Sequence, residues 1–228
     1  MRTFVIADVH GKNELFKRAL EEIDLQPSDE LIILGDLIDR GEDSKGVLDT
    51  VISLKERGYN ITCLFGNHEQ MLLDSFLSEK HYDLWLYNGG GKTLSSFQAG
   101  SIDEIPRKYI DFIRSFTYYV EHEKYIFVHA ALNMKIENPF QDITTMIWGR
   151  NPANLLDMEW LGNKKLIHGH TPIELKAIQA SHKRNDPILN IDNGAFLEKE
   201  NYGSLCILEL EKNKENYGSL FIIDAQCG

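Results

Sequence analysis

Short apolar runs alternate with segments of helical periodicity over the first 65 positions of the chain. Three runs are apolar and rich in β-branched residues, as buried strands are: 3–7, 31–34 and 61–65. Between them, apolar residues recur every three or four positions over 13–25 and 47–55, which predicts two helices. Asn13 is the expected N-cap of the first helix. This alternation favours parallel strands joined by right-handed crossovers.

The pattern changes after the third strand. Residues 68–116 have the pattern of helices and turns, and residues 118–129 have the pattern of a β-hairpin. Two further short apolar runs, 165–167 and 187–192, are expected to be strands. The sequence therefore predicts an α/β protein with strands of both orientations.

One segment near the C-terminus is repeated. The run Lys199–Leu205 recurs as 214–220, and each copy is followed by a β-prone run. Two copies are too few for a solenoid, so we expect two edge strands without a catalytic role. Residues 1–228 are expected to form a single domain, with 211–228 as a C-terminal strand extension.

Charge and composition narrow the possible functions. The chain has 24 Lys and Arg against 35 Asp and Glu, a formal charge of −11, which does not favour nucleic-acid binding. No apolar run reaches the ~18 residues that span a bilayer, and no secretory signal pattern is present. The cysteines, Cys63, Cys206 and Cys227, are widely spaced and predict no disulfide framework. These features predict a cytoplasmic protein that does not contact a membrane.

A polar cluster follows each of the first three predicted strands. The clusters are Asp8-Val9-His10, Gly35-Asp36 and Gly66-Asn67-His68-Glu69. Ligands of open α/β sheets bind at the carboxyl ends of the strands, so parallel pairing would bring the three clusters together.

The candidate metal ligands combine oxygen and nitrogen donors. They are Asp8, His10, Asp36, Asn67, His129 and His170. Such a mixture suits Mn, Fe or Zn and does not suit a calcium cage or a thiolate zinc site. Six protein ligands exceed the needs of one catalytic metal, so they indicate two ions that share a bridging carboxylate.

Three motifs carry a family resemblance. Asp8-x-His10, the run from Gly35 to Gly41 (GDLIDRG) and the run from Gly66 to Glu69 (GNHE) are similar to the signature of the calcineurin-like metallophosphoesterases. Within these, the chain resembles the phosphoprotein phosphatase (PPP) family and its bacterial and phage lambda-type serine/threonine phosphatases. Further similar runs are Trp85–Gly90, Val128–Ala130, Ile147–Arg150, Gly169–Pro172 and Ile191–Ala195.

The resemblance implies roles for individual residues. Asp8 and His10 would bind one metal, Asp36 would bridge, and Asn67, His129 and His170 would bind the other. His168 competes with His170, but the family pattern places the ligand directly before Thr171. His68 would be the general acid held by Asp39, Arg40 and Arg150 would bind phosphate, and a bridging hydroxide would attack phosphorus. The two ions would be Mn²⁺, with Fe or Zn as alternatives.

The implied fold is the calcineurin-like metallophosphoesterase fold, with two mixed β-sheets packed as a sandwich flanked by helices. The implied activity is metal-dependent hydrolysis of phosphoserine or phosphothreonine in proteins. A diadenosine tetraphosphate hydrolase has the same core motifs and is the alternative, so the partner is a phosphorylated protein or a nucleotide polyphosphate. A binding protein that kept the fold without the chemistry would be expected to lack a ligand, and every motif position is present. The oligomeric state stays open.

Overall fold

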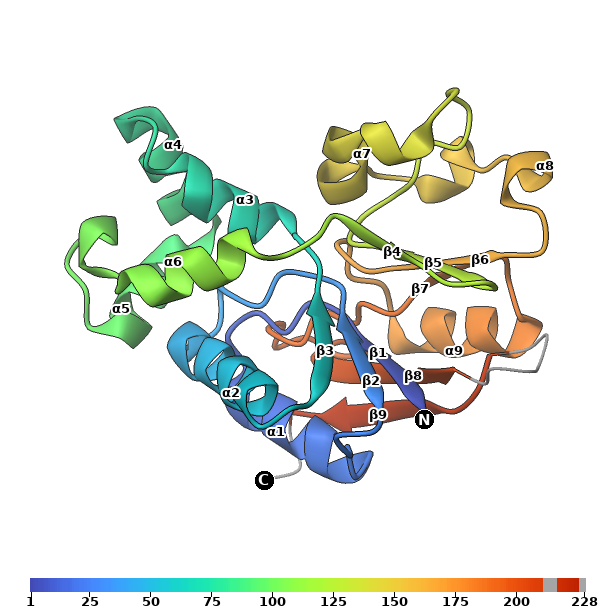
Figure 1. The fold of residues 1–228 in the computed structure, drawn as a ribbon, viewed down its shortest axis with the longest axis horizontal. Helices are drawn as coiled ribbons and strands as arrows, with labels where there is room; N and C mark the ends of the chain where they lie inside the picture. Colours follow the sequence, from blue (N-terminus) through green and yellow to red (C-terminus); the bar gives the residue numbers. More distant parts are fainter. Residues whose placement is uncertain (211–216, 226–228) are drawn as a thin grey trace.

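The computed structural model describes residues 1–210 and 217–225 and places two β-sheets face to face (Figure 1). The first sheet has the strand order β3-β2-β1-β8-β9. Its strands are β1 (Thr3–Ile6), β2 (Glu30–Ile33), β3 (Asn60–Cys63), β8 (Ser204–Leu210) and β9 (Leu220–Asp224). The first three pair in parallel and β8 and β9 pair antiparallel, so the predicted parallel unit is confirmed.

The second sheet has the order β4-β5-β6-β7 and is also mixed. Its strands are β4 (Tyr119–Glu121), β5 (Tyr125–Val128), β6 (Lys165–His168) and β7 (Ile188–Asn190). The β4–β5 pair is the antiparallel hairpin that the sequence predicts, whereas β5, β6 and β7 run in parallel. The predicted fold of two mixed sheets with flanking helices is confirmed.

Alternating side chains of β1 supply both faces of the first sheet. Phe4 and Ile6 pack into the core on the helical side, whereas Val5, and Ala7 directly after the strand, pack into the core between the two sheets. Because side chains alternate along a strand, a strand buried on both faces is apolar at every position. This explains why β1 has a continuous apolar run in place of an alternating one.

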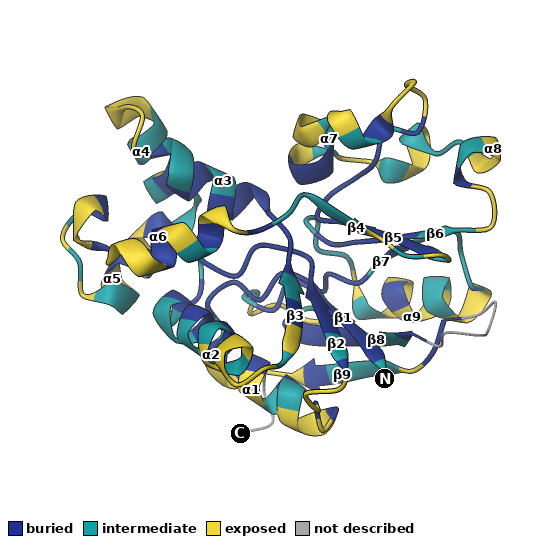
Figure 2. Ribbon diagram, viewed as in Figure 1, coloured by how far each residue is buried: buried dark blue, intermediate teal, exposed yellow. Residues whose placement is uncertain are grey.

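Helices flank the two sheets, and Leu175 and Ile178 of one of them pack into the core between the sheets (Figure 1). The helices are α1 (Asn13–Glu22), α2 (Ser44–Glu56), α3 (Asn67–Asp74), α4 (Glu79–Trp85), α5 (Gly91–Phe97), α6 (Arg107–Arg114), α7 (Ile143–Trp148), α8 (Met158–Leu161) and α9 (Leu175–Arg184). In Figure 2 the strands are mostly buried, and exposed residues concentrate on the outer surfaces of these helices. A π-helical turn, Leu86–Gly90, joins α4 to α5, and Gly89 has a φ of 111° within it.

The N-cap predicted for α1 is wrong. Lys12 takes the N-cap position, and Asn13 is the first helical residue. The Asn13 side chain instead donates to Asp43 and accepts from Thr50, which connects α1 to α2. A tertiary contact therefore uses the polar side chain that local sequence assigned to capping.

The prediction of two edge strands after the repeated segment is half wrong. β9 is an edge strand, but β8 lies between β1 and β9. Residues of β8 alternate between the two cores, with Leu205 and Ile207 on the helical side and Cys206 and Leu208 between the sheets. Burial on both faces is what a central strand requires.

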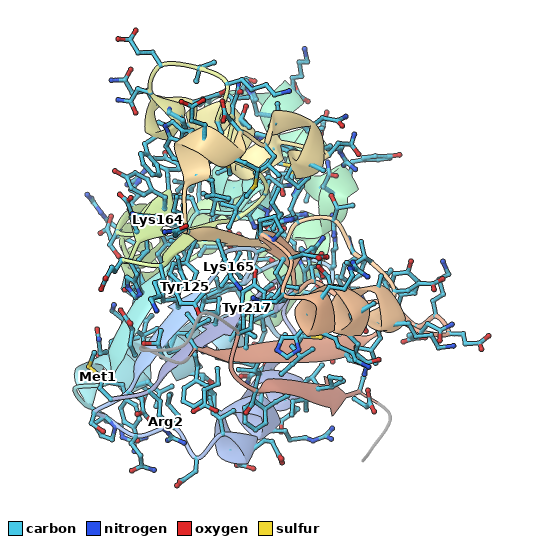
Figure 3. All side chains as sticks on the ribbon, turned by 90° about the vertical axis from the view of Figure 1, so that its right-hand side faces the viewer. Met1, Arg2, Tyr125, Lys164, Lys165 and Tyr217 are labelled. Carbon is cyan, nitrogen blue, oxygen red and sulfur yellow. The ribbon has the colours of Figure 1, made fainter. Side chains whose placement is uncertain are left out.

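The second copy of the repeat is anchored by Tyr217. Residues 211–216 and 226–228 of the predicted extension lie outside the described residues. The Tyr217 hydroxyl donates to the Asp186 carbonyl at 2.8 Å, and the Lys165 ammonium lies 4.2 Å from its ring centroid. Figure 3 shows Tyr217 beside Lys165 and Tyr125 of the second sheet. The second copy thus ties the end of the chain to the second sheet.

Within the described ranges, 1–210 and 217–225, no helix is both long enough and apolar enough to span a membrane.

Candidate metal centre

Loops that follow five strands bring the predicted ligands together. Asp8 and His10 follow β1, Asp36 follows β2, Asn67 begins α3 after β3, and the remaining two follow strands of the second sheet: His129 after β5 and His170 after β6. Both sheets therefore contribute from the carboxyl ends of their strands, as the strand-end argument predicts.

The Asp36 carboxylate lies at the middle of the cluster. Its Oδ2 atom is 3.4 Å from His10 Nε2 and 3.6 Å from His129 Nε2. Its Oδ1 atom accepts the backbone N–H of His68 at 3.0 Å, which fixes the orientation of the carboxylate. One oxygen of Asp36 therefore faces two sets of donors at once.

The second donor set is tightly grouped. His170 Nδ1 is 2.9 Å from Asn67 Oδ1, and His129 Nε2 is 3.1 Å from both atoms. In a centre with metal–donor distances near 2.1 Å, neighbouring donors lie about 3 Å apart. The spacing of these atoms fits a shared divalent cation. Within residues 1–210 and 217–225, Asp36 with His129 and His170 is one of two groups able to hold one.

The other group is Asp36 with His10 and His68. This differs from the predicted set, in which Asp8 accompanies His10. The Asp8 carboxylate accepts the backbone N–H of His170 at 3.1 Å on each oxygen, so it lies at the edge of the second donor set.

Hydrogen bonds to backbone carbonyls fix the tautomers of two histidines. His10 Nδ1 donates to the Ile38 carbonyl and His129 Nδ1 donates to the Leu34 carbonyl, each at 2.9 Å. With Nδ1 protonated, each neutral imidazole presents an Nε2 lone pair to the cluster. His129 Nε2 and Asn67 Oδ1 are then two lone-pair donors 3.1 Å apart, an arrangement suited to a cation.

The backbone of the site is unusually strained. Six of the ten predicted site residues have positive φ: Asp8, His10, Asp36, Asp39, Arg40 and His170. A non-glycine residue in this region costs about 1–3 kcal/mol and persists only where surrounding contacts hold it. Such clustering is typical of functional sites.

Burial and mutual repulsion set the charges of the carboxylates. Burial, with repulsion from Asp192 and Asp36, raises the pKa of Asp8 well above its usual value. Burial also acts on Asp36, but His129, His68 and His10 outweigh it and hold the pKa of Asp36 below its usual range. A divalent cation would relieve the repulsion that Asp8 experiences.

The histidines of the cluster favour the neutral form that ligation needs. Burial lowers the pKa values of His10 and His129, and it lowers the pKa of His170 to about 3. Neutral imidazole is the form that binds a metal. The donor set thus matches a cation in both geometry and protonation.

His68 and Asp39 form a buried pair beside this cluster. The Nδ1–H of His68 donates to Asp39 Oδ2 at 2.7 Å, and both side chains are fully buried. Burial lowers the pKa of His68, but the carboxylates of Asp36 and Asp39 outweigh it and raise the pKa above its ordinary value. His68 Nε2 lies 4.0 Å from Asp36 Oδ2 and makes no hydrogen bond with the described residues.

The two predicted phosphate ligands differ in their settings. The Arg40 guanidinium donates to His10 Nε2 at 3.1 Å and stacks 4.5 Å from the ring centroid of Phe196. Arg150 is exposed, and its charge is among those that lower the pKa of His170, which places it near the second donor set. His168 is buried and hydrogen-bonds at Nδ1 to the Gly169 carbonyl, apart from the donor set.

Several residues of the site were not predicted to have a role there. Trp85 and Thr93 hydrogen-bond to Asp39, and the Phe196 ring contacts both Arg40 and His10. Glu69 accepts the backbone N–H groups of Gly66, Asp36 and Leu37 and so connects the loops that follow β2 and β3. Trp85 begins the run Trp85–Gly90, which belongs to the family resemblance. No sequence spacing indicates the contacts of Thr93 and Phe196.

The whole arrangement agrees with a family comparison. A model described as calcineurin-like phosphoesterase matches residues 1–205. The chain belongs to the calcineurin-like phosphoesterase family. The predicted family membership is therefore confirmed.

Relatives in this family have two different names. The chain is 41% identical over 88 residues to serine/threonine-protein phosphatase 1 of Salmonella typhimurium, a match covering 38% of each chain. It is 29% identical over 158 residues to the symmetrical bis(5'-nucleosyl)-tetraphosphatase of Nitrosomonas europaea, covering 65% of this chain and 53% of that protein. Each match spans less than two thirds of the relative.

Solved structures share the fold at low identity. A putative diadenosine tetraphosphatase has a TM-score of 0.64 at 17% identity, covering 100% of this chain and 95% of that one. A serine/threonine phosphatase from Saccharomyces cerevisiae has a TM-score of 0.67 at 14% identity, covering 99% and 80%. At this identity the likeness concerns the fold alone.

Proposed function

We propose that the protein is a metal-dependent phosphomonoester hydrolase with two divalent cations. The observation that carries the proposal is the position of Asp36 Oδ2, 3.4 Å from His10 Nε2 and 3.6 Å from His129 Nε2. Two cations close together repel strongly, and a shared carboxylate offsets that repulsion.

The residues that would hold the ions are those predicted from the sequence. Asp8, His10 and Asp36 would hold one, and Asp36, Asn67, His129 and His170 the other. When bound, the ions would polarise the phosphate and activate a water molecule at neutral pH. The mixed oxygen and nitrogen donors suit Mn²⁺, with Fe or Zn as alternatives.

His68 would protonate the leaving oxygen. Its Nδ1–H is occupied by Asp39, so the proton for transfer is at Nε2, on the side of the ring that faces Asp36. The negative charge of Asp39 favours the imidazolium form that a general acid needs.

Arg40 and Arg150 would bind the phosphate oxygens. A guanidinium presents paired N–H groups that match two phosphate oxygens. The Phe196 ring makes a cation–π contact with Arg40, which limits the directions that the Arg40 guanidinium can take. These two cations would attract a dianionic substrate although the chain has a formal charge of −11.

The substrate that we propose is phosphoserine or phosphothreonine in a protein. A match of 41% identity over 88 residues to the serine/threonine phosphatase of Salmonella typhimurium supports this substrate. The second candidate is a dinucleoside tetraphosphate, because other relatives carry that name, one of them 42% identical over 74 residues and one 29% identical over 158 residues. We also propose that residues 1–228 act as one domain in the cytoplasm, in keeping with the buried free thiols of Cys63 and Cys206.

A paired kinetic measurement tests this proposal. The protein is stripped of metal and reconstituted with Mn²⁺, and kcat/KM is measured for a phosphoserine peptide and for diadenosine tetraphosphate. His68→Asn serves as the control for contaminating activity. The protein-phosphatase proposal predicts a preference for the peptide of about a hundredfold or more.

A reversed preference would replace the protein substrate by the nucleotide while keeping the same centre. Hydrolysis of neither compound by protein that has bound its metals would contradict both substrate proposals. Equal activity of wild type and His68→Asn would contradict the role of His68.

A further inference from the structure

Trp85 donates its indole N–H to the carboxylate of Asp39. Trp85 Nε1 lies 3.1 Å from Asp39 Oδ1 and 3.0 Å from Oδ2, although the two residues are 46 positions apart in the chain. Trp85 is the last residue of α4 and is fully buried. The ring is fixed from the other side by Gly90, where an added Cβ would come within 2.4 Å of it.

Thr93 of α5 makes a second contact with the same carboxylate. Its Oγ1 lies 2.6 Å from Asp39 Oδ1. A carboxylate only accepts, so the single hydroxyl proton of Thr93 points to Asp39. Ser44, whose Oγ is 2.9 Å from Thr93 Oγ1, must then donate to Thr93.

The hydrogen bonds around Asp39 therefore have one consistent direction. Its side chain accepts from His68, Trp85 and Thr93, and its backbone N–H donates to the hydroxyl oxygens of Ser44 and Thr93 at 3.0 Å each. Asp39 has a φ of 69°, a strained value that needs such contacts. Every donor stabilises the ionised carboxylate in one rotamer.

Packing alone does not account for this arrangement. Trp85 belongs to the apolar core on the helical side of the first sheet, and a phenylalanine would fill most of the same space. The N–H group is what points at Asp39. Thr93 is 1% exposed, and valine has nearly its shape without the hydroxyl. The donor atoms can therefore be removed while the shape is largely kept.

We propose that Trp85 and Thr93 are positioning residues for the general acid. They hold the Asp39 carboxylate in one orientation, and Asp39 in turn holds the His68 ring with Nε2 facing the leaving oxygen. This inference rests on the proposed role of His68. It also links α4 and α5, through one residue of each, to the proton-transfer step.

The test compares two leaving groups. An alkyl phosphate such as phosphoserine needs its leaving oxygen protonated, whereas p-nitrophenyl phosphate releases an acidic phenol that needs little protonation. We expect Trp85→Phe and Thr93→Val each to lower kcat on phosphoserine by about tenfold or more, with a much smaller loss on p-nitrophenyl phosphate. KM should change little, and Thr93→Ser should restore kcat.

Matched controls separate this effect from a loss of packing. Trp160→Phe makes the same substitution on α8, where the indole packs against Phe140. Ser75→Ala removes a buried hydroxyl of the α3 C-cap that donates to the Leu72 carbonyl. Both controls should lower kcat on the two substrates equally or not at all.

His68→Asn in the same assay distinguishes the two proposals. Its kcat should fall by about 10²–10⁴-fold on phosphoserine and by much less on p-nitrophenyl phosphate. Suppose that His68→Asn behaves in this way, but that Trp85→Phe and Thr93→Val lower kcat equally on both substrates or do not lower it. The positioning role is then wrong, and the role of His68 as general acid is kept. If His68→Asn itself shows no such difference, both the general acid and its positioning residues are wrong. Should Trp85→Phe fail to fold, Thr93→Val against Thr93→Ser decides the matter.

Discussion

At their amino-terminal ends, β1 and β2 are held by paired charges, whereas at their carboxyl ends they present crowded carboxylates and strained loops. Arg2 donates to Asp29 from its backbone N–H at 3.0 Å and from its guanidinium at 2.6 and 3.2 Å. Beyond the carboxyl ends, Asp8 and Asp36 lie in the same buried cluster and repel each other.

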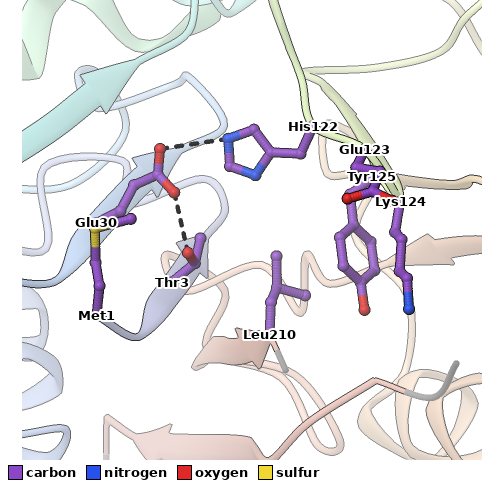
Figure 4. A pocket seen from close by; sticks show the side chains of 8 residues that line it. All are labelled: Met1, Thr3, Glu30, His122, Glu123, Lys124, Tyr125 and Leu210. Carbon is purple, nitrogen blue, oxygen red and sulfur yellow. Dashed lines mark hydrogen bonds and ion pairs between the residues drawn. The ribbon is translucent and has the colours of Figure 1, made fainter. Parts of the chain in front are cut away.

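A cavity of about 450 Å³ also lies at the amino-terminal end (Figure 4). Glu30 on its wall accepts the Thr3 hydroxyl at 3.0 Å and pairs with His122 at 3.3 Å. The cavity has no group of donors able to hold a metal among the residues the structure describes. A cavity by itself therefore does not identify the functional site. The arrangement of metal-donor atoms identifies it.

The two ends of β1 and β2 differ in how much they contribute to stability. The amino-terminal end satisfies its charges by local pairing, which stabilises the fold. The carboxyl end buries carboxylates that repel one another and holds six residues at positive φ, and both features cost stability. A bound cation would offset the repulsion. Substitutions at the two ends should therefore separate activity from stability.

The largest effect is expected at the carboxyl end. Asp36→Asn removes the charge shared by both donor sets, so kcat/KM should fall by about a thousandfold or more. Phosphatase assays on the Mn²⁺-reconstituted proteins would measure this. Asp29→Asn is the matched control, and the kcat of its folded fraction should equal that of wild type. Comparable losses in the two variants would remove the distinction between the ends.

Metal binding should stabilise the protein through the same end. A cation that binds only the folded state at a hundredfold excess over its Kd adds about 2.7 kcal/mol. Thermal unfolding of stripped protein with and without Mn²⁺ would show the increase. In Asp36→Asn the increase should be largely lost, and in Asp29→Asn it should be kept. A full increase in Asp36→Asn would place the bound metal elsewhere.

The amino-terminal ion pair should contribute a smaller amount of stability that depends on pH. Burial raises the pKa of Asp29, but hydrogen bonds from Arg2 and Gln26 outweigh it and hold the pKa below its usual value. The stabilisation is therefore present above the unfolded pKa of about 3.9 and is lost as pH falls through the folded value. Asp29→Asn should cost about 1–3 kcal/mol at neutral pH. Denaturant titrations would measure the free energies of unfolding of wild type and Asp29→Asn, which should differ at neutral pH and converge at acidic pH.

The last effect concerns the metal-free protein and has the opposite dependence on pH. Burial raises the pKa of Asp192, which follows β7 near Asp8, to about 7. As pH rises from the unfolded pKa of about 3.9 towards 7, the unfolded carboxylate ionises first, so the metal-free protein loses stability over this window. Asp192→Asn should remove that loss and raise the metal-free Tm at pH 8. An equal change at pH 4 would assign the effect to packing and not to charge.

Much of the fold could be predicted from local sequence, because its signals agree with tertiary burial. The apolar runs that form β1, β2 and β3 are continuous, since both faces of the first sheet are covered. The edge position predicted for β8 failed because local sequence does not encode which strand it joins. Asn13 failed as an N-cap because Asp43 and Thr50, far along the chain, use its side chain.

The candidate site was predictable only in part. Strand-end clusters indicate that Asp36 and Asn67 meet, and the structure brings them together with His129 and His170. The roles of these residues as ligands stay predictions. Trp85, Thr93 and Phe196 could not be placed, because their contacts depend on how distant loops and helices pack around Asp39 and Arg40.

The central claim is that one carboxylate, Asp36, is shared by two metal ions. The most direct test is the number of Mn²⁺ ions that the stripped protein binds, measured by calorimetry and by metal analysis, beside phosphatase activity at each stage of loading. We predict two ions per chain, with full activity only when both are bound, and fewer than two in Asp36→Asn. Full activity with one ion per chain, or two tightly bound ions in Asp36→Asn, would contradict the claim.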